Sequence, residues 1–451
     1  MSVSPSRAAA FDILLRIERE SSYASELLHS ATYRRLSIPD HALATELIMG
    51  VLRWRSRLDE DIAGATSQPI AKLDIEILIA LRLALYQFRW LDRIPQRAAL
   101  YESVELVKRA RKRSAAPFVN AVLRKLSAAP HEREILTNTD SDSPEILARV
   151  SAHPVWLVER WVCDYGLAAA RQICKHNQTV PVTAIRLRAP STKSELSQEG
   201  VTLAPGAFLA SARHVEAGDI TQTQAFRTRQ VVIQDEASQL VAALVGCGLR
   251  AGTRILDCCA APGSKTLAIA DRNADATLTA VELHPHRGRL LRKLLDAAHS
   301  ERVQVIVGDA RHLPVSLPFD RLLADVPCSG TGTLARNPEI KWRLAPPDLA
   351  ELQQRQSAIL RSALAQVAPG GCLIYSTCSL EKEENEDVVE QVLRENHSFR
   401  LLDCRAELDR LKASGNLTWP DPASLTRGPY LRTIPGVHPC EGFFAAILES
   451  L

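Results

Sequence analysis

The apolar positions in the first 126 residues follow a pattern typical of packed helices. Apolar side chains recur three and four residues apart, as in Ile77, Leu81 and Leu85, and glycine is scarce. Short breaks, each containing a proline, divide this pattern at residues 37–40, 67–69 and 92–95. We therefore predict a compact all-α bundle of several helices over residues 1–135.

A polar stretch separates this bundle from the rest of the chain. Residues 131–144 end in the run NTDSDSP, which is rich in turn formers and favours a linker. Beyond it, residues 156–177 have a helical pattern and residues 183–187 have the pattern of a strand. These segments predict a small α+β module over residues 145–228.

From about Gln230, short apolar runs alternate with helical segments. The predicted strands are 254–258, 277–282, 303–307, 321–325 and 372–377, and the helices that separate most of them are 265–272, 285–298, 347–367 and 384–395. This rhythm is typical of an open parallel sheet with helices on both faces, so residues 229–451 are predicted to form a Rossmann-like α/β domain. A last apolar run, 442–448, is expected to add an edge strand.

Composition narrows the class of protein. A chain of 451 residues, 46% hydrophobic and 24% charged, is long enough for two or three domains and too apolar to be largely disordered. Charged residues interrupt the first 18 residues, and no stretch approaches the roughly 20 apolar residues of a membrane span. The ten cysteines show no repeated Cys-x-x-Cys pairs and no histidine at zinc spacing, so we expect a cytoplasmic protein with reduced thiols and no metal site.

The net charge of +3 conceals a basic N-terminal part. Residues 1–130 contain 20 Lys and Arg against 14 Asp and Glu, which is a mild indication of a polyanionic partner. Five cations fall within the six residues Lys108–Arg113. This cluster fits a surface that binds a polyanion, and it fits equally well a solvated helix end whose cations suit the helix dipole.

Candidate binding residues follow the predicted strands of the α/β domain. The first strand runs into small residues that end at Lys265, and these allow a ligand to approach the backbone and a helix N-terminus closely. Glu282 ends the second strand, at a spacing that suits a ribose diol, and Asp309 follows the third, where it could accept a hydrogen bond from an adenine amino group. Any one acidic residue alone is better explained as a helix N-cap, but the set favours a nucleoside-containing cofactor.

The same segment excludes one other class of site. Residues 263–266, Gly-Ser-Lys-Thr, resemble the end of the phosphate-binding loop of nucleotide triphosphatases. That loop needs adjacent Gly and Lys and another glycine five positions earlier, whereas Ser264 intervenes here and Cys258 occupies the earlier position. A nucleotide triphosphatase is therefore not expected.

Two cysteines follow the fourth and fifth predicted strands. Cys328 comes three residues after Asp325, and Cys378 directly follows the strand that ends at Thr377. Polar and turn residues flank both thiols, which favours exposure and a nucleophilic role, but the residues alone do not show which of the two attacks. Other cysteines are expected to be small buried side chains, namely Cys163, Cys174, Cys247 and Cys372.

Three of these segments together resemble a known family. CAAPGSKT (259–266), DVPCSGTG (325–332) and STCS (376–379), in this order, are similar to motifs of the RNA cytosine-5 methyltransferases of the Nol/Nop/Sun family. Residues 40–53 and 117–124 resemble the NusB RNA-binding fold. Both halves in one chain are similar to the Sun type of this family, which modifies 16S ribosomal RNA.

The resemblance implies a cofactor and a set of roles. The cofactor is S-adenosylmethionine, held by Cys259, Ala260, Ala261, Pro262, Gly263, Ser264, Lys265, Glu282, Asp309 and Asp325. Cys378 is implied as the nucleophile that adds to carbon 6 of cytosine, and Cys328 as the cysteine involved in product release. The chemistry also calls for a carboxyl group that bonds ring nitrogen 3, a role open to Asp325. Residues 336–342 are similar to a family segment that lies near RNA, although Ala335 and Glu339 depart from its pattern.

We therefore expect a monomeric methyltransferase that modifies carbon 5 of one cytosine in 16S ribosomal RNA. Two other functions stay open. A transfer-RNA cytosine-5 methyltransferase would use the same residues. A non-catalytic NusB-like RNA-binding factor would need a degenerate cofactor pocket, whereas every position named above is chemically intact.

Overall fold

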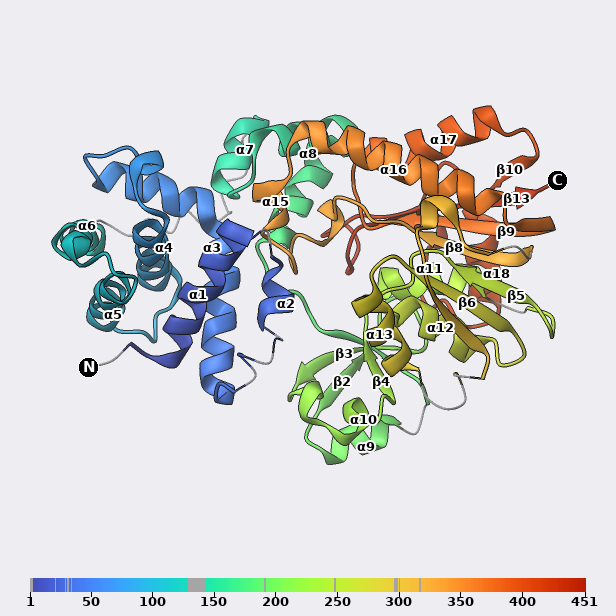
Figure 1. Cartoon of the computed structure of the whole chain (residues 1–451), viewed down its shortest axis with the longest axis horizontal. Helices are drawn as coiled ribbons and strands as arrows, with labels where there is room; N and C mark the ends of the chain where they lie inside the picture. Colours follow the sequence, from blue (N-terminus) through green and yellow to red (C-terminus); the bar gives the residue numbers. More distant parts are fainter. Residues whose placement is uncertain are drawn as a thin grey trace. The chain divides into compact units, whose positions relative to one another are not determined.

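The computed structural model describes residues 3–128 apart from 21, 29, 31 and 34, and residues 143–189, 192–246, 249–295, 299, 301–315 and 318–451. The chain divides into two units (Figure 1). The first unit consists of Met1–Val180 and Leu334–Arg343, and the second of Pro181–Thr333 and Leu344–Leu451. Each unit has its own buried hydrophobic core.

The first unit is helical, as the spacing of apolar residues predicts. Its helices are α1 (Pro5–Glu20), α2 (Ala24–Leu28), α3 (Ile38–Ala65), α4 (Ile75–Trp90), α5 (Gln96–Arg109), α6 (Ala116–Ala128), α7 (Pro144–Val150), α8 (Val155–Asn177) and α15 (Ile340–Arg343). The expected breaks at 67–69 and 92–95 separate α3 from α4 and α4 from α5, which confirms them.

The other expected boundaries differ in detail. α3 begins already at Ile38, because the Ser37 hydroxyl accepts a hydrogen bond from the Asp40 N–H and caps the helix. Within the expected linker, residues 131–142 lie outside the described residues, and Pro144 is the first residue of α7.

Much of the Lys108–Arg113 cluster is engaged within the helical unit. Three of its five cations form ion pairs at 2.6–2.9 Å, namely Lys108 with Glu105, Arg109 with Asp12, and Lys112 with Asp74. Exposed pairs of this kind contribute about 0–1 kcal/mol each. The structure therefore favours a solvated helix end over an RNA-binding surface as the explanation of this cluster.

A short segment from the C-terminal half of the sequence, Leu334–Arg343, completes the helical unit. The Trp342 indole N–H donates to the Leu52 carbonyl oxygen at 2.6 Å, and the Lys341 ammonium donates to the Arg53 carbonyl oxygen at 2.9 Å. Lys341 is almost fully buried, and this burial lowers its pKa well below the usual range. A buried polar nitrogen without a partner is costly, so this hydrogen bond stabilises the segment in its observed position.

This packing bears on the RNA contact that the resemblance implies for residues 336–342. Glu339 is also buried, and its carboxylate accepts a hydrogen bond from the Ala24 N–H at 2.8 Å, at the start of α2. Glu339 and Lys341 are thus committed to the interior of the helical unit. The structure gives these two side chains a packing role in place of a contact with RNA.

The second unit begins with a small antiparallel sheet in the order β2-β3-β1-β4. Its strands are β1 (Ala184–Leu187), β2 (Thr202–Pro205), β3 (Ala212–Ala217) and β4 (Val231–Ile233), with the short helices α9 (Thr192–Gln198) and α10 (Gln224–Arg227). The strand expected at 183–187 is confirmed. Arg186 and Arg188 both pair with Asp271 of the neighbouring larger fold, at 2.7 and 2.9 Å, which ties the small sheet to it.

The larger sheet of this unit has the order β11-β12-β13-β9-β8-β5-β6-β7, with β10 also paired to β13. Its strands are β5 (Arg254–Asp257), β6 (Thr277–Glu282), β7 (Val303–Val307), β8 (Phe319–Asp325), β9 (Val367–Thr377), β10 (Phe399–Leu402), β11 (Thr426–Arg427), β12 (Tyr430–Thr433) and β13 (Phe443–Ser450). The five predicted strands pair in parallel as β9-β8-β5-β6-β7, so the expected Rossmann-like core is confirmed.

The prediction of an edge strand at 442–448 is wrong. β13 lies inside the sheet, where it pairs antiparallel with β9 on one side and with β12 and β10 on the other. All of its residues from Phe443 to Leu448 are buried. A continuous apolar run is typical of a strand covered on both faces, and an edge strand would expose polar side chains.

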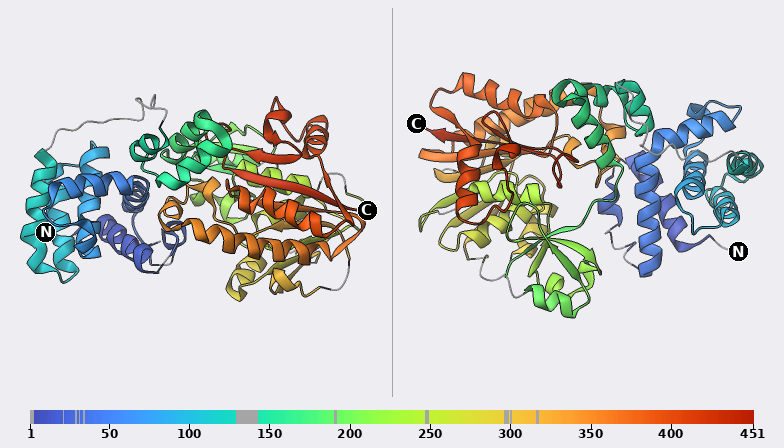
Figure 2. Two further views of the ribbon diagram at one scale, coloured as in Figure 1. Left: turned by 90° about the horizontal axis from the view of Figure 1, so that it is seen from above. Right: turned by 180° about the vertical axis from the view of Figure 1, so that it is seen from behind.

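Helices cover both faces of the large sheet (Figure 2). They are α11 (Glu236–Val245), α12 (Ser264–Arg272), α13 (Pro285–Leu294), α16 (Pro346–Leu364), α17 (Glu386–Glu395) and α18 (Cys404–Ala413). Alternate strand residues point to opposite faces, so Leu323 of β8 packs with α11, α12 and α18, whereas Leu322 packs with α16 and α17. This arrangement leaves the carboxyl ends of the parallel strands open.

The remaining cysteines are only partly as expected. Cys174 and Cys372 are buried, which confirms that prediction, and Cys247 lies outside the described residues. Cys163 is exposed, so its predicted burial is wrong. The buried face of α8 is formed by residues such as Val158 and Trp161, and the helical turn places Cys163 away from that face.

Candidate active site

Five strand ends of the large sheet open on one cavity of about 540 Å³. Its wall includes seven of the residues singled out in the sequence, namely Cys259, Ala261, Glu282, Asp309, Asp325, Cys328 and Cys378. The other five, Ala260, Pro262, Gly263, Ser264 and Lys265, line a small adjoining hollow that shares Cys259, Ala261 and Asp325 with the cavity. The structure thus brings all of the predicted site residues together, where the strand order reverses between β5 and β8.

The loop from β5 to α12 forms one side of this cavity. Gly263 has a φ of 112°, which favours glycine, and a Cβ there would lie 2.4 Å from a methyl carbon of Leu291. Beneath the loop, the Thr266 hydroxyl donates to Asp257 at 2.7 Å, and burial raises the pKa of Asp257 to about 7. The small residues let the main chain itself face the cavity.

Two further carboxylates lie at the ends of β6 and after β7. Glu282 accepts hydrogen bonds from the main-chain N–H groups of His284 at 2.9 Å and of Ala261 at 3.3 Å, and so joins the loop to the start of α13. Asp309 accepts from the Arg311 N–H at 2.9 Å, and the Arg311 guanidinium lowers the pKa of Asp309. The N-cap explanation therefore holds for Asp309, although its side chain also lines the cavity.

Asp325 ends β8 within a small polar cluster. One of its oxygens accepts from the Ser376 hydroxyl at 2.7 Å, and the other lies 2.7 Å from the Lys265 ammonium. The Lys265 nitrogen is also 4.9 Å from the centre of the Phe443 ring. Burial lowers the pKa of Lys265, but Asp325 more than offsets this and the pKa is raised overall, so the lysine stays charged.

Cys328 and Cys378 face each other with their sulfur atoms 3.3 Å apart. The parallel pairing of β8 with β9, which sets Asp325 opposite Ser376, aligns the two loops that carry them. A hydrogen bond with Cys378, together with burial, raises the pKa of Cys328 well above its usual value. Either thiol can be the donor in this contact, and the raised pKa of Cys328 favours its protonated form.

Close main-chain packing holds these two loops together. The Gly332 N–H donates to the Cys378 carbonyl oxygen at 2.9 Å, and the Gly442 N–H donates to the Gly332 carbonyl oxygen at 2.9 Å. A Cβ at Gly332 would lie only 2.2 Å from the Gly442 carbonyl oxygen. The glycine in the loop after Cys328 is thus required by the approach of three chain segments.

The chain is similar in sequence to known ribosomal RNA methyltransferases. Residues 248–449 match the family model described as 16S rRNA methyltransferase RsmB/F, and residues 4–128 match the NusB family. The chain is 33% identical over 405 residues to the "Probable ribosomal RNA small subunit methyltransferase B" of Bacillus subtilis (strain 168), covering 87% of this chain and 89% of that protein. It is 31% identical over 452 residues to the ribosomal RNA small subunit methyltransferase B of Vibrio cholerae, covering 98% and 97%. The chain belongs to the RsmB/F family of methyltransferases.

Solved structures agree with this family at the level of the fold. The crystal structure of PH0851 superposes with a TM-score of 0.80 over 100% of both chains, at 23% identity. A methyltransferase homolog from Pyrococcus horikoshii superposes with a TM-score of 0.57 over 69% of this chain and all of that one, at 25% identity. The helical NusB-like bundle followed by a Rossmann-like methyltransferase fold is therefore confirmed, as is the enzyme class, an RNA methyltransferase of the S-adenosylmethionine-dependent type.

The methyltransferase has a buried support for both cysteine loops that the sequence did not reveal. The Glu384 carboxylate accepts hydrogen bonds from the Ser329 N–H at 2.8 Å and from the hydroxyls of Ser329 and Ser379, the residues that directly follow the two cysteines. The Gln356 amide also donates to it at 2.8 Å and to the Pro327 carbonyl oxygen at 3.0 Å. Glu384 thus connects the Cys328 loop to the Cys378 loop.

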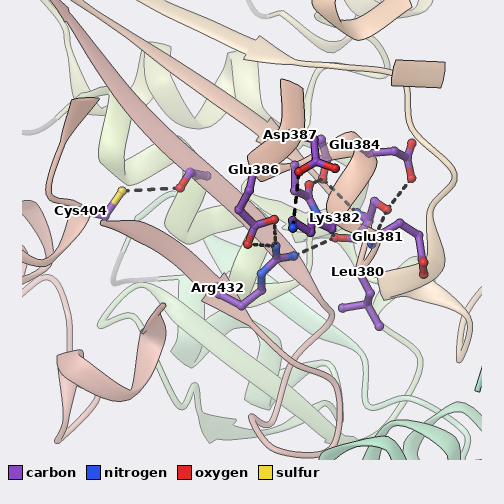
Figure 3. A network of polar contacts seen from close by, with 12 residues as sticks. Leu380, Glu381, Lys382, Glu384, Glu386, Asp387, Cys404 and Arg432 are labelled. Atoms are coloured by element: carbon purple, nitrogen blue, oxygen red, sulfur yellow. Dashed lines mark hydrogen bonds and ion pairs between the residues drawn. The ribbon is translucent and has the colours of Figure 1, made fainter. Parts of the chain in front are cut away.

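Figure 3 shows the surroundings of Glu384. One terminal nitrogen of the Arg432 guanidinium, from β12, lies 2.9 Å from both carboxylate oxygens of Glu386, and the other donates to the Ser379 carbonyl oxygen at 3.2 Å. The Tyr375 hydroxyl donates to the main-chain carbonyl of Glu384 at 2.6 Å. Because Glu384 lies at the start of the predicted helix 384–395, its sequence position suggested only an acidic helix end; α17 begins two residues later.

In the described part of the chain, no group of three or more His, Cys, Asp or Glu side chains is arranged to hold a metal ion. None of the helices described is long and apolar enough to cross a membrane. In the cavity at the strand ends, thiols and carboxylates lie together with the imidazole of His284 and the guanidinium of Arg287.

Proposed function

We propose that this protein methylates carbon 5 of one cytosine in 16S ribosomal RNA, through a covalent bond between Cys378 and the base. The observation that carries the proposal is the pair of sulfur atoms, 3.3 Å apart, in the same cavity as Asp325 and Glu282. Two thiols beside a carboxylate suit a reaction in which one thiol adds to the ring and the other helps it to leave. Family membership supports RNA as the substrate class.

The cavity fits S-adenosylmethionine in size and in chemistry. Its volume of about 540 Å³ lies in the ordinary range for a small-molecule site. Glu282 would hold the ribose hydroxyls and Asp309 the adenine amino group, with the main chain of residues 259–265 against the rest of the molecule. When bound there, the cofactor supplies an electrophilic methyl group.

Cys378 is the proposed nucleophile. Its thiolate adds to carbon 6 of the cytosine, which breaks the aromaticity of the ring and makes carbon 5 nucleophilic. After carbon 5 has accepted the methyl group, a base takes the proton from carbon 5, the electron pair of that bond restores the ring double bond, and the bond between carbon 6 and the sulfur breaks. Cys378 thereby returns as a thiolate.

Cys328 is the proposed partner in this release. Its hydrogen bond with Cys378 is the main reason why the pKa of Cys328 is raised. Once Cys378 is bound to carbon 6, its sulfur is a neutral thioether and a weaker partner for the Cys328 thiol. The pKa of Cys328 then falls, so its thiol loses a proton more readily when a base is required.

Asp325 and Lys265 are proposed to orient the base. A carboxyl group that bonds ring nitrogen 3 and the exocyclic amine stabilises the charge that develops during the attack. Ser376 and Lys265 each bind one oxygen of Asp325 at 2.7 Å, which fixes the direction of the carboxyl group. All of these residues come from one chain, so we propose that the protein acts as a monomer.

The helical unit and the small sheet are proposed to bind RNA. The basic surplus of residues 1–130 supports this role for the helical unit. Because Trp342 and Lys341 pack on Leu52 and Arg53, removal of residues 1–135 would leave these two side chains without their partners as well as remove RNA contacts. Substitutions that neutralise cations on the surface of the helical unit therefore test its RNA binding more cleanly than truncation does.

Methyl transfer to defined RNAs tests the proposal directly. The protein is incubated with labelled S-adenosylmethionine and either 16S ribosomal RNA or a transfer-RNA mixture. Transfer of the label is measured, and the methylated position is mapped by bisulfite sequencing. We expect 5-methylcytidine at a single position of the 16S RNA. Transfer of label only to transfer RNA would favour the alternative substrate, and absence of transfer to any RNA would favour a non-catalytic RNA-binding factor.

The role of Glu282 can be tested without RNA. Glu282→Ala removes the proposed hydrogen bonds to the ribose and should weaken S-adenosylmethionine binding by a factor on the order of 10–100, as for bonds to a charged group. Calorimetry measures this directly, with the exposed Glu301→Ala as a matched control. Equal affinities in wild type and Glu282→Ala would exclude Glu282 from the cofactor site.

A further inference from the structure

One helix beside the active site has an exposed face without negative charge. α13 contains four cations, Arg287, Arg289, Arg292 and Lys293, and no Asp or Glu, and all four are exposed. Leu290 on the same helix is 57% exposed, although the helix also packs on the sheet through Leu291. Cations with an apolar side chain between them suit a polyanion that also has apolar parts.

The position of α13 links two spaces on the surface of the second unit. His284 and Arg287, at its beginning, line the cavity that contains Cys378. Leu294, at its end, lines a separate hollow of about 510 Å³. The exposed face of α13 therefore runs from the active site towards this hollow.

The hollow itself combines apolar walls with cations. β4 contributes Val231–Ile233 and the end of α10 contributes Phe226, which is half-buried. Arg227 and Arg229 also line it. Arg227 is exposed, and no acidic side chain among the described residues pairs with it. Arg229 donates a long hydrogen bond, 3.5 Å, to the Leu295 carbonyl oxygen. An aromatic ring beside cations is a surface on which an unstacked nucleotide can bind.

The hollow is also adjacent to the cofactor loop. Pro262 and Ser264 line it from one side, and the same two residues line the small hollow that shares Ala261 and Asp325 with the active-site cavity. The two spaces are therefore separated by a single loop. A chain that enters the active site with one nucleotide can reach the hollow with a neighbouring one.

We propose that this surface, the exposed face of α13 with the hollow beside Phe226, binds the RNA strand that carries the target cytosine. Arg289 and Lys293 bind its phosphates, and a nucleotide next to the target lies against Phe226. These two cations are four residues apart, so they lie on the same side of the helix. The inference rests on the proposed function, because an enzyme that acts on carbon 5 must take its base out of the stack, which frees the neighbouring nucleotides.

A double substitution tests the phosphate contacts. In Arg289→Ala/Lys293→Ala, the KM for 16S RNA should rise about 10-fold at moderate salt, and the slope of log affinity against log salt should become shallower by about 1.4. The kcat at saturating RNA and the affinity for S-adenosylmethionine should stay within about 2-fold of wild type, since neither cation touches the reacting atoms. The matched control, Arg394→Ala/Lys412→Ala, removes two exposed cations elsewhere in the second unit and should leave both KM and slope unchanged.

Phe226 provides a test that does not depend on charge. Phe226→Leu keeps apolar volume in the hollow but removes the ring, and should raise the KM for RNA about 5- to 100-fold, with Phe226→Ala at least as weak.

If the wild type methylates RNA and both the Phe226→Leu and the double variant keep its KM and salt slope, the inference is wrong while the proposed function stands. If the double variant instead alters self-association of the RNA-free protein with KM unchanged, the face is an interface between copies, which also overturns it. If the wild type methylates no RNA, the proposed function itself is wrong, and the inference that rests on it falls as well.

Discussion

Cys378→Ser should abolish methylation, and it should do so without leaving any covalent protein–RNA species. The hydroxyl of serine is a poor nucleophile, so carbon 6 is not attacked and carbon 5 is never activated. Loss of a catalytic nucleophile lowers kcat by a factor on the order of 10³ or more. Methyl transfer to 16S RNA and denaturing electrophoresis of the reaction mixture measure the two outcomes.

Cys328→Ala should fail in a different way. It keeps the attacking thiol of Cys378 but removes the thiol 3.3 Å away that is proposed to help release the product. A covalent protein–RNA adduct should therefore accumulate when S-adenosylmethionine and RNA are both present. The adduct should survive denaturing electrophoresis, and it should be absent from the double variant Cys328→Ala/Cys378→Ser.

The exposed Cys163 supplies a matched control for both substitutions. Cys163 is exposed and is not among the residues that line the cavity, so Cys163→Ser should retain full activity without an adduct. An adduct in Cys378→Ser and none in Cys328→Ala would mean that the roles of the two cysteines are reversed. Full activity in both variants would mean that no covalent bond to the base is needed.

The sequence predicts the parallel core of the fold well because its signals are local. Each of the five parallel strands is a short apolar run bounded by turn residues, and the motif residues follow directly at the strand ends. The wrong prediction for β13 did not come from its pattern. Its run from Phe443 to Leu448 is apolar without alternation, which indicates burial on both faces. Only its position at the end of the chain suggested an edge.

Other features depend on contacts between distant parts of the chain. Leu334–Arg343 lies between β8 and α16 in the sequence, yet its Trp342 and Lys341 bond to carbonyl groups of α3. Nothing in the periodicity of such a short segment indicates which core it will join. The same holds for the ion pairs of Lys108 and Arg109, whose partners decide between a solvated helix end and an RNA-binding surface.

The candidate site divides in the same manner. Motif order and strand ends were enough to predict that Glu282, Asp325, Cys328 and Cys378 would meet, and the structure brings them to one cavity. Their chemical roles remain predictions. The supporting residues were missed because Glu384 and Gln356 carry no motif of their own, and their role arises only where the two cysteine loops meet.

Glu384→Gln should therefore lower kcat by about 100-fold or more, although Glu384 contacts neither sulfur atom. Its carboxylate accepts hydrogen bonds from Ser329, Ser379 and Gln356. An amide nitrogen in place of one oxygen would turn a donor towards these donors and leave some of them unpaired, at about 1–3 kcal/mol for each buried group. A displacement of about 1 Å between reacting groups is enough for such a loss of rate.

A role in positioning predicts more than a loss of stability. S-adenosylmethionine affinity should stay within about 2-fold of wild type, because Glu384 lies behind the cysteine loops and outside the residues proposed to hold the cofactor. In the Cys328→Ala background, Glu384→Gln should slow formation of the covalent adduct, since the attacking sulfur itself is then displaced. The matched control is Glu390→Gln, which changes an exposed residue of α17. If Glu384→Gln lowers the melting temperature but forms the adduct at the wild-type rate, Glu384 stabilises the fold without setting the geometry of the cysteines.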